Sequence, residues 1–150
     1  LQRFDRDVLM QPGVSHVIVL EGVNDISRGT GTRDARDEIS AQELIAAHTQ
    51  LVQRAHERGV LIYGGTLTPI GGMGGLTPER IAKRDAFNAW MRTSGVYDAV
   101  IDFDRITRDP SDTTRFLPAY DSGDHLHPND AGYKAMGDAI SLALFRRRVR

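Results

Sequence analysis

The sequence predicts an α/β fold, with an open and mostly parallel sheet covered by helices on both faces. Three apolar runs, at residues 17–20, 60–68 and 99–103, alternate along the chain with segments of helical spacing. The first run reads VIVL without a polar break, as is typical of parallel strands buried on both faces. At 150 residues the chain is long enough for one domain with a hydrophobic core and too short for two.

Local signals indicate where the helices between these strands begin and end. Ser40 and Glu43 form a capping-box pattern, in which each side chain binds the backbone N–H of the other residue. Gly59 is placed to cap the end of this helix. A second helix is predicted over residues 77–95, because a Thr-Pro pair opens the segment and a glycine closes it. A third is predicted from Pro128, since proline suits the first helical position.

Composition argues against several kinds of partner. The net charge is −1 and no basic stripe runs through the body of the chain, so we expect no nucleic acid partner. No apolar run approaches the length of a transmembrane helix and no signal peptide is visible. We therefore expect no membrane partner. The sequence does not determine the cellular compartment of the protein. Without cysteine the chain has no disulfide framework and no thiolate metal site.

The first residues indicate that the chain is part of a longer domain. It opens on Leu1, and the apolar residues that follow have helical spacing with no capping residue before them. A strand at residues 17–20 would also expose a long apolar edge in a sheet of three strands. We therefore expect strands before Leu1, and we expect that missing segment, or another copy of the chain, to pair with this edge.

Two polar clusters are expected to meet at the carboxyl edge of the sheet. Residues 22–25 (GVND) follow the first strand, and Asn24 offers a side-chain amide that can stabilise an oxyanion. Residues 124–129 (DHLHPN) lead into the last helix. There His127 would lie near the N-cap, where the helix dipole disfavours the imidazolium, and Asp124 would lie beside it. A neutral histidine beside a carboxylate is what a general base needs to activate a hydroxyl nucleophile.

Other interpretations of these residues stay open. Asn24 could be a turn asparagine that bonds its own backbone, and Asp25 a turn-stabilising carboxylate. His125 and His127 form an H-x-H pair that could bind a metal on an extended segment. A metal site needs a third and usually a fourth ligand, and the other histidines fall on other elements, so we expect no metal and no cofactor. One of them, His48, lies on an apolar helix face and is expected in the core or at its boundary.

These two clusters resemble two conserved blocks of the SGNH, or GDSL-type, hydrolases, in the expected order and about a hundred residues apart. The resemblance implies a three-layer α/β/α fold with a parallel, flavodoxin-like sheet. Residues 1–150 would form a single domain that is the C-terminal part of it, without the first strands. By the same resemblance Asp124 is the triad acid and His127 the base, while Asn24 and Gly22 belong to the oxyanion- and substrate-binding region.

The serine of that family, in a Gly-Asp-Ser motif after the first strand, has no counterpart in this sequence. The one Asp-Ser pair ends at Ser122, which is too close to Asp124 to present its hydroxyl to His127. The resemblance thus implies a serine hydrolase of acyl esters, including acetyl and carbohydrate esters, whose serine lies outside this chain. We expect the chain alone to be inactive. The alternative is a truncated, non-catalytic α/β module that serves binding or assembly.

Overall fold

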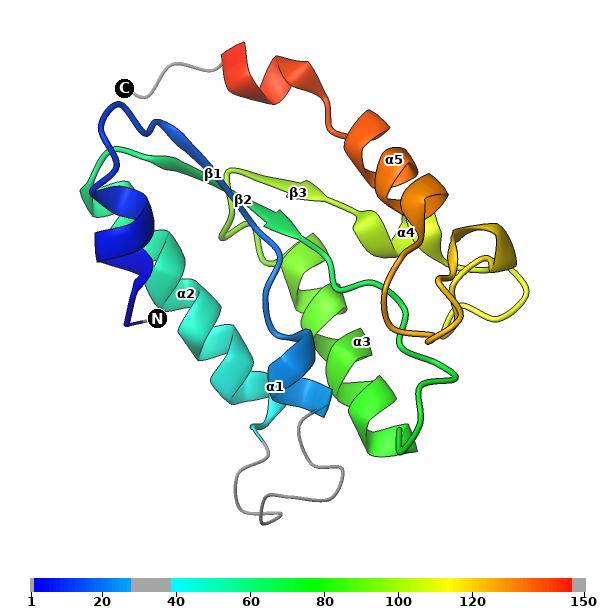
Figure 1. Ribbon diagram of the computed structural model, residues 1–150. Coiled ribbons are helices and arrows are strands. Elements are labelled where there is room, and N and C mark those ends of the chain that lie inside the picture. The colour runs from blue at the N-terminus through cyan, green and yellow to red at the C-terminus, as the bar shows by residue number, and fades with distance from the viewer. Residues whose placement is uncertain (1, 28–38, 147–150) are drawn as a thin grey trace.

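The computed structural model describes residues 2–27 and 39–146 (Figure 1). Its three strands form one parallel sheet in the order β1-β2-β3. The strands are β1 (His16–Val19), β2 (Leu61–Gly65) and β3 (Ala99–Ile101). The α/β fold and the parallel sheet predicted from the sequence are therefore confirmed.

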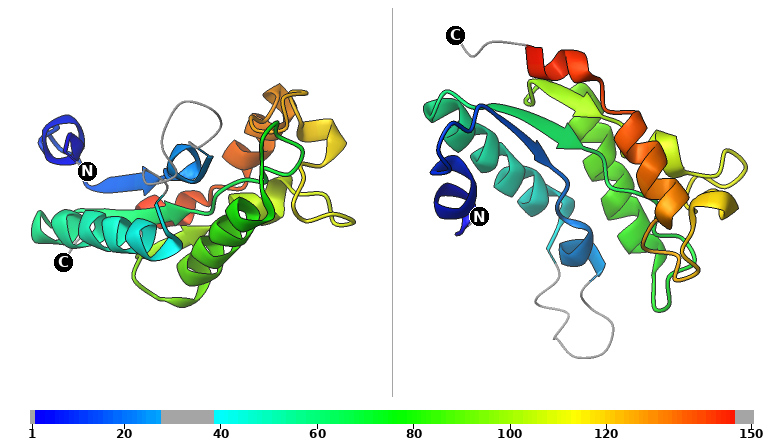
Figure 2. Two further views of the ribbon diagram at one scale, coloured as in Figure 1. Left: turned by 90° about the horizontal axis from the view of Figure 1, so that it is seen from below. Right: turned by 45° about the horizontal axis from the view of Figure 1, so that its top comes forward.

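Helices fill the connections between the strands and follow the last one. They are α1 (Val23–Ser27), α2 (Ala41–Glu57), α3 (Pro78–Thr93), α4 (Phe103–Thr107) and α5 (Asp130–Asp138), with short π or 3₁₀ turns at Asp5–Leu9, Pro118–Tyr120 and Leu142–Arg146. The long helices α2 and α3 lie together beside the sheet, and α5 lies at its other side (Figure 1 and Figure 2). In the described part of the chain, no helix is long and apolar enough to cross a bilayer.

The two faces of the sheet bury different clusters because successive strand residues point to opposite faces. Ile62 of β2 belongs to the larger cluster, which includes Leu44 of α2 and Phe87 of α3. Tyr63, the next residue, belongs to a smaller cluster with Met136 of α5. All five side chains are buried. The sheet thus has helices packed on both faces, as expected.

The capping signals of α2 are present as predicted. The hydroxyl of Ser40 accepts the Glu43 N–H at 3.1 Å, and the Glu43 carboxylate accepts the Ser40 N–H at 2.7 Å. Gly59, just beyond the helix, has φ +67°, a conformation that favours glycine and suits a helix C-terminal cap. These contacts are local in sequence, which is why residue types alone could predict them.

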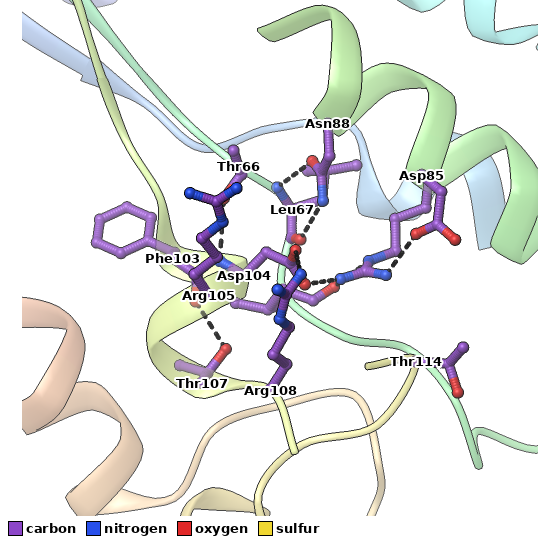
Figure 3. A network of polar contacts seen from close by, with 12 residues as sticks. Thr66, Leu67, Asp85, Asn88, Phe103, Asp104, Arg105, Thr107, Arg108 and Thr114 are labelled. Carbon is purple, nitrogen blue, oxygen red and sulfur yellow. Dashed lines mark hydrogen bonds and ion pairs between the residues drawn. The ribbon is translucent and has the colours of Figure 1, made fainter. Parts of the chain in front are cut away.

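A buried ionic network joins α3 to α4 (Figure 3). Its centre is Asp104, which is 3% exposed and is bound by Arg84, Arg92 and Arg108. The distances from Asp104 to Arg92 and Arg108 are 2.6 and 3.1 Å. Thr66, next after β2, accepts the Asp104 N–H at 2.9 Å. Every charge in the network therefore has a partner, as burial of charge requires.

The chain that leaves β2 is held by side chains of α3 in place of a neighbouring strand. The Asn88 amide accepts the Leu67 N–H and donates to the Leu67 carbonyl, both at 2.8 Å (Figure 3). Arg84 donates through Nε to the Thr68 carbonyl at 2.9 Å. These bonds satisfy backbone groups that are buried beyond the last ladder bond. Leu67 and Thr68 are thereby fixed at the carboxyl end of the sheet.

His48 is a core residue, as expected, with an exposed fraction of 2%. Its Nδ1 lies 2.5 Å from the hydroxyl of Tyr97, and its ring packs edge-on against Phe87 at 4.7 Å. Burial lowers the pKa of His48 to about 4, because the charged ring would lose its hydration. The ring is therefore neutral near neutral pH.

We expect the protein to lose stability as the pH falls from about 6.5 towards 4. In that interval the unfolded chain binds a proton at His48 that the folded protein does not bind, so the free energy of unfolding decreases with falling pH. The shift from 6.5 to about 4 corresponds to a loss on the order of 3 kcal/mol. Chemical denaturation at about pH 7 and about pH 4.5 measures it. His48→Phe should be less acid-sensitive than the wild type; equal sensitivity would contradict the assignment.

Candidate active site

Asp124 and His127 form a hydrogen-bonded pair in the loop before α5. Nδ1 of His127 lies 2.6 Å from Oδ2 of Asp124. Oδ1 of Asp124 accepts the backbone N–H groups of Leu126 and His127 at 2.9 and 2.8 Å. The bond from the His127 ring, followed by these backbone bonds, holds the pKa of Asp124 well below its usual range. The Asp124 carboxylate is therefore ionised near neutral pH.

The protonation of the pair follows from its geometry. An ionised carboxylate can only accept hydrogen bonds, so Nδ1 of His127 is the donor in this contact and carries the proton. In the neutral ring, Nε2 then has a free lone pair. Both side chains reach solvent, with 62% of His127 and 51% of Asp124 exposed. In residues 2–27 and 39–146, no side chain is hydrogen-bonded to Nε2 of His127. The Ser122 hydroxyl donates to Oδ1 of Asp124 at 2.9 Å, so it is directed to Asp124 and not to His127.

The structure corrects the expected position of His127 at the helix. Helix α5 starts at Asp130, and its N-cap is Asn129, whose side chain accepts the Gly132 N–H at 3.0 Å. His127 therefore lies two residues before the cap, and Pro128 is not the first helical residue. The expected effect of the helix dipole on the ring is lost. The Asp124 carboxylate is what orients the ring.

Asn129 has a role in this loop that was not predicted from the sequence. Besides capping α5, its amide donates to the carbonyls of Ala119 and Asp121 at 3.0 and 3.1 Å. The loop is thus closed onto the start of the helix. Asparagine is among the preferred N-cap residues, so the signal was present in the sequence.

A second Asp–His pair lies in the same loop. Nδ1 of His125 lies 2.5 Å from Oδ2 of Asp121, and Oδ1 of Asp121 accepts the N–H groups of Gly123 and His125. Partial burial opposes ionisation of Asp121, but these bonds leave its pKa below the usual value. The two histidines of the H-x-H pair therefore face different carboxylates. Among the described residues, no three His, Asp or Glu side chains are grouped as metal ligands would be.

Gly22 and Asn24 lie where the chain leaves β1 and enters α1. Gly22 is buried with φ +119°, and a Cβ on it would lie 3.0 Å from the side chain of Leu44. Its carbonyl accepts the N–H groups of Asp25 and Ile26, both at 3.1 Å, which begins the helical turn. Asn24 is exposed on that turn. A side chain at position 22 would be strained and crowded, so glycine is required there.

A cavity of about 160 Å³ lies between the two polar clusters. It is lined mostly by apolar side chains: Leu20, Val23, Leu67, Thr68, Leu126, His127, Pro128, Tyr133 and Met136. His127 thus shares a cavity with Val23, the neighbour of Asn24, at the carboxyl ends of β1 and β2, where open parallel sheets bind ligands. Asn24 and Asp124 themselves are not lining residues of this cavity.

Three solved structures have the fold of this chain. A GDSL-like lipase from Bacteroides thetaiotaomicron is 17% identical, with a TM-score of 0.70 over 97% of this chain and 68% of that chain. A Bacteroides fragilis protein assigned to the acylhydrolases is 22% identical, with a TM-score of 0.70 over 97% of this chain and 67% of that chain. A catalytic mutant of an acetylxylan esterase from Geobacillus stearothermophilus is 19% identical, with a TM-score of 0.64 over 92% of this chain and 62% of that chain.

The sequence comparison agrees with the fold. None of the curated proteins compared with the chain is significantly similar to it. A family model for GDSL-like lipases and acylhydrolases, however, matches residues 1–135, which is most of the chain. This match confirms the resemblance noted from residues 22–25 and 124–129, and a family of lipases and acylhydrolases supports ester hydrolysis in general. The chain belongs to the GDSL-like lipase/acylhydrolase family.

Proposed function

We propose that this chain carries the acid–base part of a serine ester hydrolase. The observation that carries the proposal is the 2.6 Å contact between Nδ1 of His127 and the ionised carboxylate of Asp124, on a histidine that lines the cavity. His127 acts as the general base, Asp124 orients the ring and stabilises the imidazolium, and Asn24 donates to the oxyanion. Gly22 gives the turn under Asn24 its conformation.

The reaction would proceed in two steps, acylation of the serine and hydrolysis of the acyl-serine. The serine oxygen bonds to the ester carbonyl carbon while Nε2 of His127 takes its proton, and the alcohol leaves with that proton as the tetrahedral intermediate collapses. Water then attacks the acyl-serine with the same ring as base, and the acid and the free serine are released. Small acyl groups suit the cavity of about 160 Å³. Acetyl and carbohydrate esters are the substrates we propose, in line with the acetylxylan esterase that shares the fold.

We infer that the serine lies outside these 150 residues, on a segment that pairs with the free edge of β1. In the described part of the chain β1 pairs with β2 alone. Ile18 of β1 is 37% exposed, and an apolar edge strand is normally covered. The chain also covers only about two thirds of the similar structures, which leaves room for such a segment.

The proposal is tested by reaction with an organophosphate that phosphorylates activated serines. The protein that joins this chain to its serine segment should gain one adduct by intact mass spectrometry, and the chain alone should gain none. A chain that hydrolyses nothing with the segment present, and forms dimers instead through β1, would overturn the proposal in favour of an assembly module.

Asn24→Ala is expected to lower kcat on an acetyl ester by roughly 10²–10³, with little change in KM, because an oxyanion donor acts mainly in the transition state. Steady-state kinetics of the serine-containing protein measure both constants. The control is Asp25→Ala, which changes the next exposed residue of α1 and should keep the wild-type kcat. Equal kcat values for the two variants would remove Asn24 from the proposed mechanism.

A further inference from the structure

Asn129, the N-cap of α5, is bonded to three successive carbonyl groups of the loop before that helix. Its backbone N–H donates to the Tyr120 carbonyl at 2.8 Å. Its side-chain amide donates to the carbonyls of Ala119 and Asp121 at 3.0 and 3.1 Å. The oxygen of the same side chain accepts the Gly132 N–H at 3.0 Å. A single residue therefore joins the loop to the first turn of the helix.

Gly132 lets the loop lie directly on this turn. It is buried in α5, and a Cβ at this position would lie 2.8 Å from the carbonyl oxygen of Tyr120 and 2.9 Å from Cβ of Pro128. A backbone carbonyl and a proline ring cannot turn aside as a flexible side chain can. Glycine is unfavourable within a helix compared with alanine. The close approach of the loop explains why glycine is needed in the first turn of α5.

The contacts of this turn reach the proposed base through the backbone. Pro128 directly follows His127, and both residues line the cavity. The His127 carbonyl accepts the Ser122 N–H at 3.1 Å, so the two sides of the loop are joined beside the base. Helix α5 lines the same cavity through Tyr133 and Met136. The place of the imidazole relative to these side chains therefore depends on how the loop rests on α5.

We propose that the first turn of α5, through Asn129 and Gly132, positions His127 in the cavity for proton transfer. The proposal rests on the function proposed for His127. Neither Asn129 nor Gly132 is among the described residues that line the cavity, so both are positioning residues. Asn129 acts by binding the carbonyls of the loop, and Gly132 acts by leaving room for Tyr120 and Pro128.

Alanine at each of two glycines of α5 tests the proposal with a matched pair. Both changes favour the helix. A Cβ at Gly137 meets no atom within 4 Å, whereas a Cβ at Gly132 would displace the loop. In the serine-containing protein, Gly132→Ala should lower kcat by roughly 10- to 100-fold with KM within about twofold, because a base displaced by about 1 Å transfers the proton more slowly. Gly137→Ala should keep the wild-type kcat. Equal kcat values in the two variants would overturn the proposal.

Two substitutions of Asn129 separate the contacts with the loop from the cap of the helix. Aspartate and serine both serve as N-caps. An ionised aspartate has no N–H to donate, and a serine hydroxyl has a single proton for two carbonyls. Both Asn129→Asp and Asn129→Ser should keep the helix by circular dichroism and lower kcat by about tenfold or more with little change in KM. A loss in Asn129→Asp alone would be an effect of charge and would contradict the role of the loop contacts.

Amide hydrogen exchange tests the contact between loop and helix in this chain without any activity. The amides of Ser122 and Asn129 both donate to carbonyls of the loop. In Gly132→Ala we expect them to lose protection by about tenfold or more. The Tyr133 amide, which is bonded within the first turn of α5, should keep its protection. Gly137→Ala should change none of the three. Equal patterns in the two variants, or loss at Tyr133 as well, would contradict the proposal.

The outcomes separate this inference from the proposed function. If His127→Ala abolishes activity while Gly132→Ala keeps the wild-type kcat, the positioning role is wrong and the proposed function stands. If His127→Ala keeps full activity, the proposed function is wrong. Hydrogen exchange then still decides whether the first turn of α5 holds the loop.

Discussion

Replacing His127 with alanine is expected to lower kcat for hydrolysis of an acetyl ester by about 10³-fold or more, because the serine would lose its general base. Asp124→Asn should lower kcat by roughly 10³–10⁴-fold, since an amide at this position can hold the ring in the wrong tautomer. Steady-state assays of the serine-containing protein measure both effects. The two losses should not add in the double variant, because the residues act as one unit.

The second Asp–His pair provides a matched control for this prediction. His125→Gly removes an imidazole that also faces a carboxylate in the same loop, and glycine accepts the φ of +62° at that position. This variant should retain activity close to the wild type. If His125→Gly abolished hydrolysis while His127→Ala did not, the base would have to be reassigned to His125.

Asp104→Ala is expected to lower the free energy of unfolding by about 3–5 kcal/mol, because the buried guanidinium of Arg84 would lose its only buried carboxylate partner among the described residues. Arg84 is 2% exposed and cannot turn to water, and Arg92 and Arg108 would lose the same partner. Denaturation in urea at neutral pH measures the loss. The fold of the variant should be checked first by circular dichroism, because a loss of this size approaches the stability of a small domain.

The control for this variant is another carboxylate on the same arginine. Asp85 binds Arg84 at 2.7 Å but is 55% exposed, so Asp85→Ala should cost less than about 1 kcal/mol. Similar losses in Asp85→Ala and Asp104→Ala would mean that burial of Asp104 does not determine the strength of its interactions.

Sequence reasoning succeeded where the deciding contacts are local. The capping box of Ser40 and Glu43 spans three residues, and the Asp124–His127 contact has the same spacing. The apolar run at residues 17–20 correctly predicted the first strand, because its composition is typical of a parallel strand covered on both faces. Such contacts depend on residue types and short spacings, which the sequence contains in full.

The burial of the polar face of α3 could not be predicted from local sequence patterns. Arg80, Arg84 and Asn88 recur every four residues and have the pattern of a solvated stripe, yet all three are buried. Asn88 is buried because its amide completes the backbone of Leu67, and Arg84 because it meets Asp104. Both side chains are buried because of partners about 20 residues away in the sequence. Helical periodicity contains no information about these partners.

The start of α5 was predicted wrongly because two helix signals compete there. Pro128 suits the first helical position, but Asn129 supplies a side-chain acceptor for the Gly132 N–H, and this bond determines the start. The Asp121–His125 pair was missed because it needs a positive φ at a histidine. That conformation is uncommon outside glycine, so nothing in the residue types predicts it.

The loop before α5 forms both of its Asp–His contacts within nine residues, 121–129, and in each case the aspartate also accepts backbone N–H groups two to four positions ahead. Under the proposed function the acid and the base would therefore belong to one short loop, and their mutual geometry would depend little on the strands of the sheet. The loop would then keep its Asp–His contacts whether or not the proposed serine segment is present.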